Sequence, residues 1–172
     1  SCCRYCVKGD LYRVEGEEHM AQLQPYCAIE GNDDGLPVVF VHGMGVDHRS
    51  LMMLDKAFDG NDSIRRIYLD LPGFGRTPAL PEHACGLPEM ADWLQTAIDG
   101  LVGKAAPFAM VGNSMGGALV REVLAREPRR VAGMVLIAPV VDPQHAGRHV
   151  AEHVVAQPNP KLRSEERRVG KE

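Results

Sequence analysis

The sequence has no excess of basic charge and no long apolar run. Its 23 acidic residues outnumber its 19 lysines and arginines, which gives a formal net charge of -4, and both signs are scattered along the 172 residues. We therefore expect no nucleic-acid partner. No stretch approaches the ~20 apolar residues that a membrane span needs, and residues 1–19 lack the apolar core of a signal peptide. These absences argue against a membrane partner and predict a soluble, cytoplasmic protein.

Cysteine is scarce, and its placement does not suit a disulfide framework. The five cysteines are an odd number, and Cys2, Cys3 and Cys6 crowd at one end of the chain. Cys3 and Cys6 form a Cys-x-x-Cys pair, which supplies half of a zinc site, but no second pair follows at a ligand spacing. We therefore expect reduced thiols, no bound metal and no cofactor.

What the sequence does contain is an alternation of short apolar runs with longer helical patterns. With 45% hydrophobic residues, the chain can bury the core of one domain. Apolar residues at successive positions suit strands covered on both faces, and such runs span residues 38–41, 64–69, 108–111 and 134–138. Residues 87–102 and about 115–126 carry helical patterns. The alternation predicts an α/β fold, with a mostly parallel sheet and helices on both faces.

A Gly-x-Ser-x-Gly motif centred on Ser114 lies between the third run and the helix expected after it. This is the context of a nucleophile elbow, in which the serine sits on a tight, strained turn above the sheet. Gly112 and Gly116 would remove side chains that clash with the neighbouring strand and helix. The turn leaves the N–H of Met115 at a helix N-terminus, where it stabilises an oxyanion. We predict Ser114 as the nucleophile, with Asn113 as part of the motif.

Two further motifs follow the first and second apolar runs. His42-Gly43-Met44-Gly45 comes directly after residues 38–41, and an Asp-x-x-Gly-x-Gly turn begins at Asp70. A lone histidine at a strand end is a candidate general base. Asp70 is expected to hydrogen-bond the backbone of its own loop.

Together these motifs resemble the first part of an α/β-hydrolase. With Leu-Ile-Ala-Pro at residues 136–139, they follow the family's order and spacing over about residues 26–142. The resemblance implies that the N–H of Met44 is the second oxyanion donor and that His42 shapes this loop. Because Ser114 replaces the aspartate nucleophile of other members, it implies acyl transfer. The expected reaction is hydrolysis of a small-molecule ester, amide or carbon–carbon bond.

The same resemblance implies that the triad acid and histidine follow the nucleophile in chain order, well beyond residue 142. Asp142 is an internal alternative for the acid, and otherwise a turn residue before Pro143. We therefore expect an N-terminal fragment that lacks the last strands of its sheet. Without its base the fragment is expected to be inactive.

The two ends of the sequence differ from the rest. Residues 163–172 resemble a translated sequencing adapter and are interpreted as an artefact tail. Residues 1–19 show no periodicity and are an N-terminal extension that is either native or foreign. Residues 20–162 are expected to form the partial hydrolase domain, with a lid region that begins at about residue 143.

Three alternatives stay open from the sequence. His48, near the expected pocket, either contacts substrate or is exposed to solvent. His149 and His153 fit the inverted zinc-peptidase pattern His-x-x-Glu-His, although no third ligand follows before the adapter-like end. A noncatalytic ligand-binding protein on the same scaffold is the third alternative, because function depends on the site and not on the fold.

Overall fold

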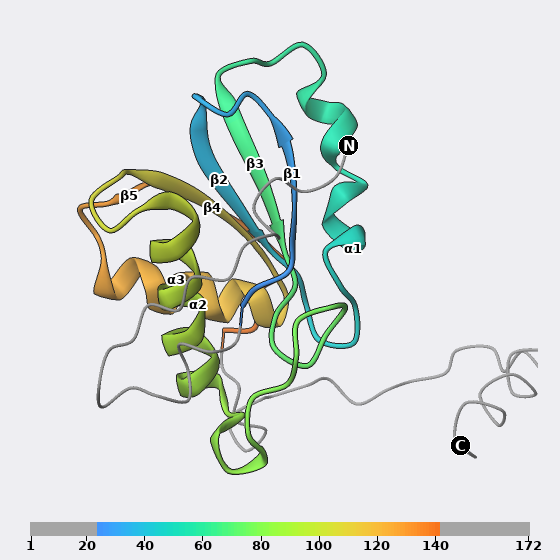
Figure 1. Cartoon of the computed structure of the whole chain (residues 1–172), viewed down its shortest axis with the longest axis vertical. Coiled ribbons are helices and arrows are strands. Elements are labelled where there is room, and N and C mark those ends of the chain that lie inside the picture. The colour runs from blue at the N-terminus through green and yellow to red at the C-terminus, as the bar shows by residue number, and fades with distance from the viewer. Residues whose placement is uncertain (1–23, 142–172) are drawn as a thin grey trace, which may run out of the picture. The chain divides into compact units, whose positions relative to one another are not determined.

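The computed structural model of the protein describes residues 24–141 (Figure 1). Several of the predictions concern parts of the chain outside the described residues: the extension 1–19, Asp142, the lid region from about 143, the pair His149 and His153, and the adapter-like residues 163–172.

Within residues 24–141, five strands form one sheet in the order β1-β3-β2-β4-β5. Their bounds are Cys27–Gly31 for β1, Leu36–Val41 for β2, Ile64–Leu69 for β3, Phe108–Asn113 for β4 and Val131–Ile137 for β5. Strand β1 pairs antiparallel with β3, whereas β3, β2, β4 and β5 are parallel neighbours. The carboxyl ends of the four parallel strands therefore share one edge, where the loops after β2, β3 and β4 come together.

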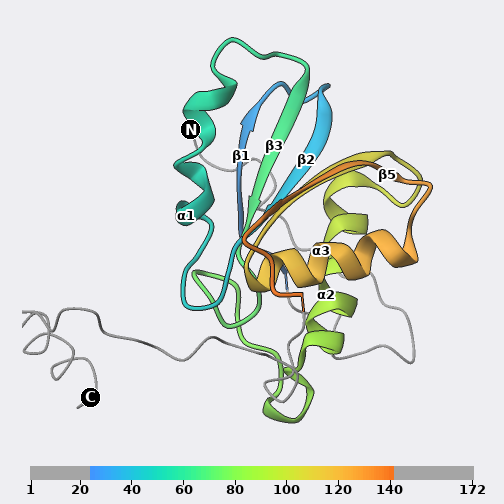
Figure 2. The ribbon, with the colours of Figure 1, turned by 180° about the vertical axis from the view of Figure 1, so that it is seen from behind.

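Helices cover both faces of this sheet. Helices α2 (Leu87–Val102) and α3 (Met115–Arg126) pack on one face, and the short helix α1 (Arg49–Met52) packs on the other (Figures 1 and 2). Val39 and Val41 of β2 join the core beneath α2 and α3, whereas Val38 and Phe40 join a second cluster with Leu51 of α1. Successive side chains of a strand point to opposite faces, so one apolar strand supports both layers. Two 3-10 helices, η1 (Asp55–Phe58) and η2 (Glu82–Ala84), lie in the connections.

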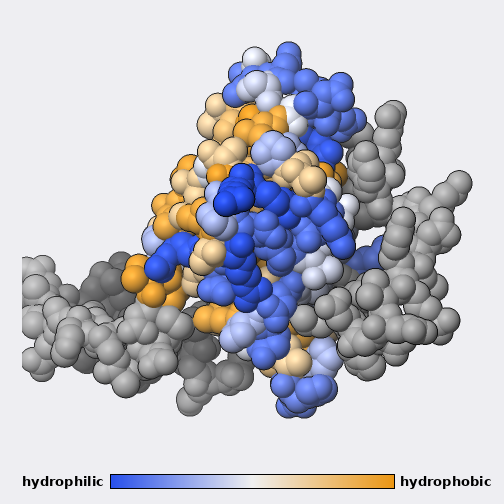
Figure 3. All heavy atoms as spheres, turned by 90° about the vertical axis from the view of Figure 1, so that its left-hand side faces the viewer, coloured by the Kyte–Doolittle hydropathy of each residue, from blue (hydrophilic) through white to orange (hydrophobic). Residues whose placement is uncertain are grey.

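The edge strand β5 is less covered than the central strands. Its side chains Val135 and Leu136 are 55% and 36% exposed, whereas Val39 of β2 is fully buried. Figure 3 views the side on which β5 lies, and hydrophobic residues gather along the left border of that view while hydrophilic residues cover its centre. An apolar edge strand with exposed side chains favours association with further strands.

The predicted α/β fold and mostly parallel sheet are confirmed, and helices α2 and α3 have the predicted bounds. Strand β3 matches its run, whereas β2, β4 and β5 extend beyond theirs. Strand β5 ends at Ile137, one residue before the predicted end, because Ala138 leaves the strand with φ 42°. Strand β1 was not predicted. In the part of the chain that the structure describes, the helices fall short of the length and apolar character of a bilayer-spanning segment.

Candidate active site

Ser114 lies alone between β4 and α3, where the chain turns sharply. Its backbone has φ 51° and ψ -114°, a conformation that a non-glycine residue adopts only under strain. Its N–H donates to the carbonyl oxygen of Ile137 at 3.0 Å. Its own carbonyl oxygen accepts from the N–H groups of Gly117 and Val140, at 3.0 and 2.9 Å. These hydrogen bonds hold the strained turn between α3 and the end of β5.

The glycines on either side of this turn allow it to sit close to the sheet. A Cβ at Gly112 would lie 2.6 Å from Cγ2 of Val120 and 2.7 Å from the carbonyl oxygen of Gly116. A Cβ at Gly116 would overlap the carbonyl oxygen of Val41 and lie 2.5 Å from that of His42. Real Cβ atoms do not approach such atoms within 3.0 Å, so a larger residue at either position would displace its neighbours.

The loop after β2 meets the same turn. A Cβ at Gly43 would lie 3.1 Å from Cβ of Ser114 and 3.0 Å from Oδ1 of Asn113, whose Nδ2 donates to the end of β5. The next residue, Met44, has a side chain that is 72% exposed. Met115 is the first residue of α3, so its N–H has no acceptor within the helix. The structure thus places both the loop that carries Met44 and the N-terminus of α3 next to Ser114.

His42 is fully buried, and both of its ring nitrogens have partners. Nε2 accepts the N–H of Leu71 at 3.0 Å, and Nδ1 lies 2.7 Å from the carbonyl oxygen of Gly43. Because Nε2 is the acceptor, Nδ1 carries the proton and donates it to Gly43. Burial lowers the pKa of His42 below its usual value, which favours the neutral ring. The ring therefore supports the loop and has no free nitrogen to serve Ser114 as a general base.

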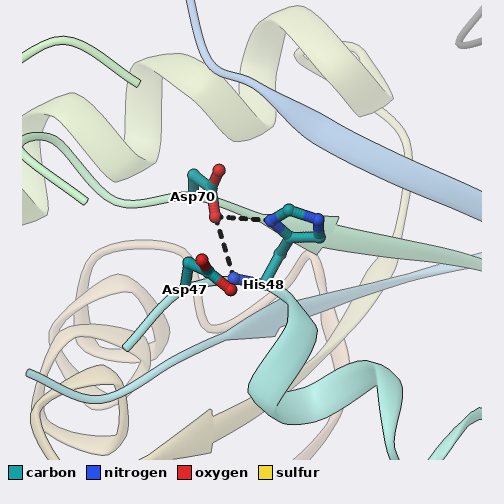
Figure 4. A group of neighbouring side chains, drawn as sticks. All are labelled: Asp47, His48 and Asp70. Atoms are coloured by element: carbon teal, nitrogen blue, oxygen red, sulfur yellow. Dashed lines mark hydrogen bonds and ion pairs between the residues drawn. The ribbon is translucent and has the colours of Figure 1, made fainter. Parts of the chain in front are cut away.

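Asp70 follows β3 and is also fully buried. Its Oδ1 accepts the backbone N–H and the ring Nδ1–H of His48, both at 2.8 Å (Figure 4). Its Oδ2 accepts the N–H of Arg76 at 2.9 Å, so Asp70 bonds its own loop as expected. His48 is buried, so of the two alternatives left open for it, exposure to solvent is wrong.

Asp47, His48 and Asp70 are the described side chains that lie close enough together to share a metal ion. One ligand atom from each lies within 4.8 Å of the others (Figure 4). These atoms are already hydrogen-bonded, however, since Nδ1 of His48 donates to Asp70. Nε of Arg49 donates to both carboxylate oxygens of Asp47, at 3.0 and 3.1 Å, and this contact lowers the pKa of Asp47 to about 2. The geometry fits a hydrogen-bonded anchor better than a metal centre.

The pairing of His48 with Asp70 is the part of this site that sequence reasoning missed. The two residues are 22 positions apart in the sequence, and no sequence motif contains both of them. A signal was nevertheless present, because His48 follows the loop after β2 and Asp70 follows β3. These strands are parallel neighbours, so an imidazole and a carboxylate at their carboxyl ends lie within reach.

The model of the alpha/beta hydrolase fold family matches residues 37–162. A dihydrolipoyllysine-residue acetyltransferase component of an acetoin cleaving system, from Pseudomonas putida, is 34% identical over 108 residues, which cover 63% of this chain and 28% of that protein. A pimeloyl-[acyl-carrier protein] methyl ester esterase from Legionella pneumophila (strain Paris) is 31% identical over 112 residues, which cover 63% of this chain and 40% of that protein.

Among solved structures, an alpha/beta superfamily hydrolase from Oenococcus oeni PSU-1 has a TM-score of 0.67 and 24% sequence identity. The match covers 83% of this chain and 54% of that one, and it shows the shared fold. The chain spans less than half the length of the two curated relatives described above.

Proposed function

The chain belongs to the alpha/beta hydrolase fold family, and from this premise we propose that it is the N-terminal part of a serine hydrolase that cleaves small-molecule esters. The observation that carries the proposal is the strained backbone of Ser114, with φ 51° at the turn between β4 and α3. Strain of this kind is retained where it serves a site, here by presenting Oγ above the sheet. The similarity to a methyl ester esterase supports an ester as the bond that is cleaved.

In the proposed reaction, Oγ of Ser114 attacks the carbonyl carbon of the ester and gives its proton to a general base. The carbonyl oxygen takes the negative charge and accepts hydrogen bonds from the N–H groups of Met115 and Met44. The intermediate then expels the alcohol, which takes the proton from the base, and the acyl group stays on Ser114. Water attacks this acyl group with the help of the same base, which releases the acid and restores the serine.

The proposed base and triad acid lie later in the chain than the described residues. Of the described histidines beside the site, His42 uses both ring nitrogens for Leu71 and Gly43, and His48 uses Nδ1 for Asp70. We expect the acid to be Asp142 or a later residue and the base to be a later histidine. The limited share of the esterase relative that this chain spans supports this expectation. The 172-residue chain alone is then expected to show no appreciable turnover.

A fluorophosphonate probe applied to the complete protein tests the nucleophile. Attack by Oγ forms a Ser114–phosphorus bond and releases fluoride, which mass spectrometry detects as a stable adduct. Ser114→Ala should abolish this adduct. Ser63→Ala is the matched control, because Ser63 lies in an exposed turn before β3 and its Oγ bonds Asn61. Labelling that survives Ser114→Ala would overturn the assignment, and a complete absence of labelling would favour a noncatalytic binding protein.

A further inference from the structure

Asp70 and Leu71, the two residues that follow β3, hydrogen-bond the two ends of the loop that carries Met44. At the start of this loop, the N–H of Leu71 donates to Nε2 of His42 at 3.0 Å. At its end, Oδ1 of Asp70 accepts the backbone N–H and the ring Nδ1–H of His48, each at 2.8 Å (Figure 4). The loop from residue 42 to residue 48 is therefore fastened at both ends to one short stretch of the neighbouring chain.

Between these ends, the 42–48 loop has little packing of its own. The side chains of Met44 and Val46 are 72% and 43% exposed. Gly45 has φ 78°, and a Cβ at this position would meet nothing within 4 Å. Gly43 lies against Ser114, but it has no side chain to hold it there. The position of the Met44 N–H therefore depends on the hydrogen bonds at the two ends.

Asp70 is well suited to hold one of these ends. Its side chain is fully buried, and its Oδ2 accepts a third N–H, from Arg76, at 2.9 Å. The loop after β3 wraps so closely around it that a Cβ at Gly75 would overlap the carboxylate. A buried carboxylate depends on such charge-assisted hydrogen bonds, because each lost donor leaves charge unsatisfied. The carboxylate is thus fixed between the two loops.

We infer that Asp70 is a positioning residue of the oxyanion hole, which acts through His48 to set where the N–H of Met44 lies. The inference rests on the proposed function, because Met44 is an oxyanion donor only if Ser114 is the nucleophile. In this role Asp70 contacts neither the substrate nor the reacting atoms. It fixes the loop that presents the donor to them.

Amide hydrogen exchange of the 172-residue chain measures this anchor directly. His48→Ala removes the bond between the ring and Asp70. A hydrogen bond to a charged group shifts an equilibrium by about 10- to 100-fold, so the amide of residue 48, which donates to Oδ1 of Asp70, should exchange about 10-fold faster or more. His48→Asn keeps a side-chain N–H close to the position of Nδ1 and should restore the protection.

Asp55→Asn is the matched control for this experiment. Asp55 is also an aspartate bound to β3, since it accepts hydrogen bonds from Arg66 at 2.6 Å and Tyr68 at 2.8 Å, but it holds η1 and not the 42–48 loop. It should leave exchange at the amide of residue 48 unchanged. Equal exchange in His48→Ala and the unmodified chain would overturn the inference. Equal acceleration by Asp55→Asn would do the same, because the effect would then be general loss of stability.

Steady-state kinetics of the complete protein with p-nitrophenyl acetate test the catalytic consequence. Removing one oxyanion donor lowers kcat by about 10²- to 10³-fold, so a displaced donor in His48→Ala should lower kcat by about 10- to 100-fold with little change in KM. His48→Asn should recover most of this loss. A change confined to KM, or an unchanged kcat, would overturn the positioning role.

The two proposals fail in different ways. Absence of a fluorophosphonate adduct on Ser114 refutes the proposed function, and the role in the oxyanion hole falls with it. A normal adduct together with an unchanged kcat in His48→Ala refutes only the role of Asp70, and the serine hydrolase stands.

Discussion

Replacing Gly116 by alanine tests whether close contact between α3 and the end of β2 builds the turn at Ser114. Alanine normally stabilises a helix by about 1 kcal/mol relative to glycine. At this position the new Cβ would overlap the carbonyl oxygen of Val41 and lie 2.5 Å from that of His42. These are backbone atoms and cannot rotate away. Overpacking of this kind costs about 3 kcal/mol at the upper end of its usual range, so we expect a net loss of about 2 kcal/mol.

Gly100→Ala is the matched control, because it makes the same chemical change in the other long helix. Gly100 lies in α2, and a Cβ there would meet nothing within 4 Å. The helix preference of alanine then acts without a steric penalty, and we expect the free energy of unfolding to rise by about 0.5–1 kcal/mol. The two variants should therefore change stability in opposite directions.

Trp93 is a suitable fluorescent probe for measuring the stability of these variants. It is the single tryptophan of the sequence, it lies in α2, and it is 1% exposed. Its fluorescence during urea unfolding reports the free energy of unfolding at low protein concentration by linear extrapolation. A Gly116→Ala variant as stable as the unmodified chain, or a shift of the same sign in both variants, would refute the steric reasoning.

Three further predictions use the same preparations. Ser114→Gly should be more stable than Ser114→Ala by about 1 kcal/mol, because glycine relieves the positive φ, and equal urea midpoints would argue against strain. Burial lowers the pKa of His42 from 6.5. Below that pH the unfolded chain therefore binds more protons than the folded one, and the free energy of unfolding falls on acidification by up to about 1.4 kcal/mol per pH unit. His42→Asn cannot take up this proton and should flatten the slope, whereas an identical slope would contradict the assignment. Val135→Lys should raise the concentration at which light scattering shows aggregation, because a charge opposes pairing at the exposed edge. Leu54→Lys, which changes an exposed residue outside the strands, should leave that concentration unchanged.

The elements that the sequence predicted best are those whose signal is local and continuous. Helix α2 repeats its apolar positions over 16 residues and ends before Gly103, whose φ of 99° suits glycine. Strand β1 gives no comparable signal. It has five residues, of which Cys27 is buried while Glu30 and Gly31 are exposed, and it exists because β3 offers a free side for antiparallel pairing. A short edge strand of this kind is determined by tertiary contact and not by its own pattern.

The same distinction applies to the candidate site. The position of Ser114 between a strand and a helix followed from contiguous residues, because the motif includes both ends of the turn. The anchor at His48 depends on Asp70, which only the pairing of β2 with β3 brings close. The tautomer of His42 depended in turn on the N–H of Leu71, a backbone group that no residue pattern marks.

The two sides of the site are therefore held by different neighbours. The turn at Ser114 is bonded to the end of β5 through Ile137 and to the following Val140, whereas the 42–48 loop is bonded to the end of β3. Because β5 is the exposed edge strand, its fraying should loosen the turn and leave the loop in place. Amide exchange at Ser114 should then follow that of β5, while exchange at the amide of His48 follows the integrity of its bond to Asp70. Further strands beside β5 would thus immobilise the strand that holds Ser114.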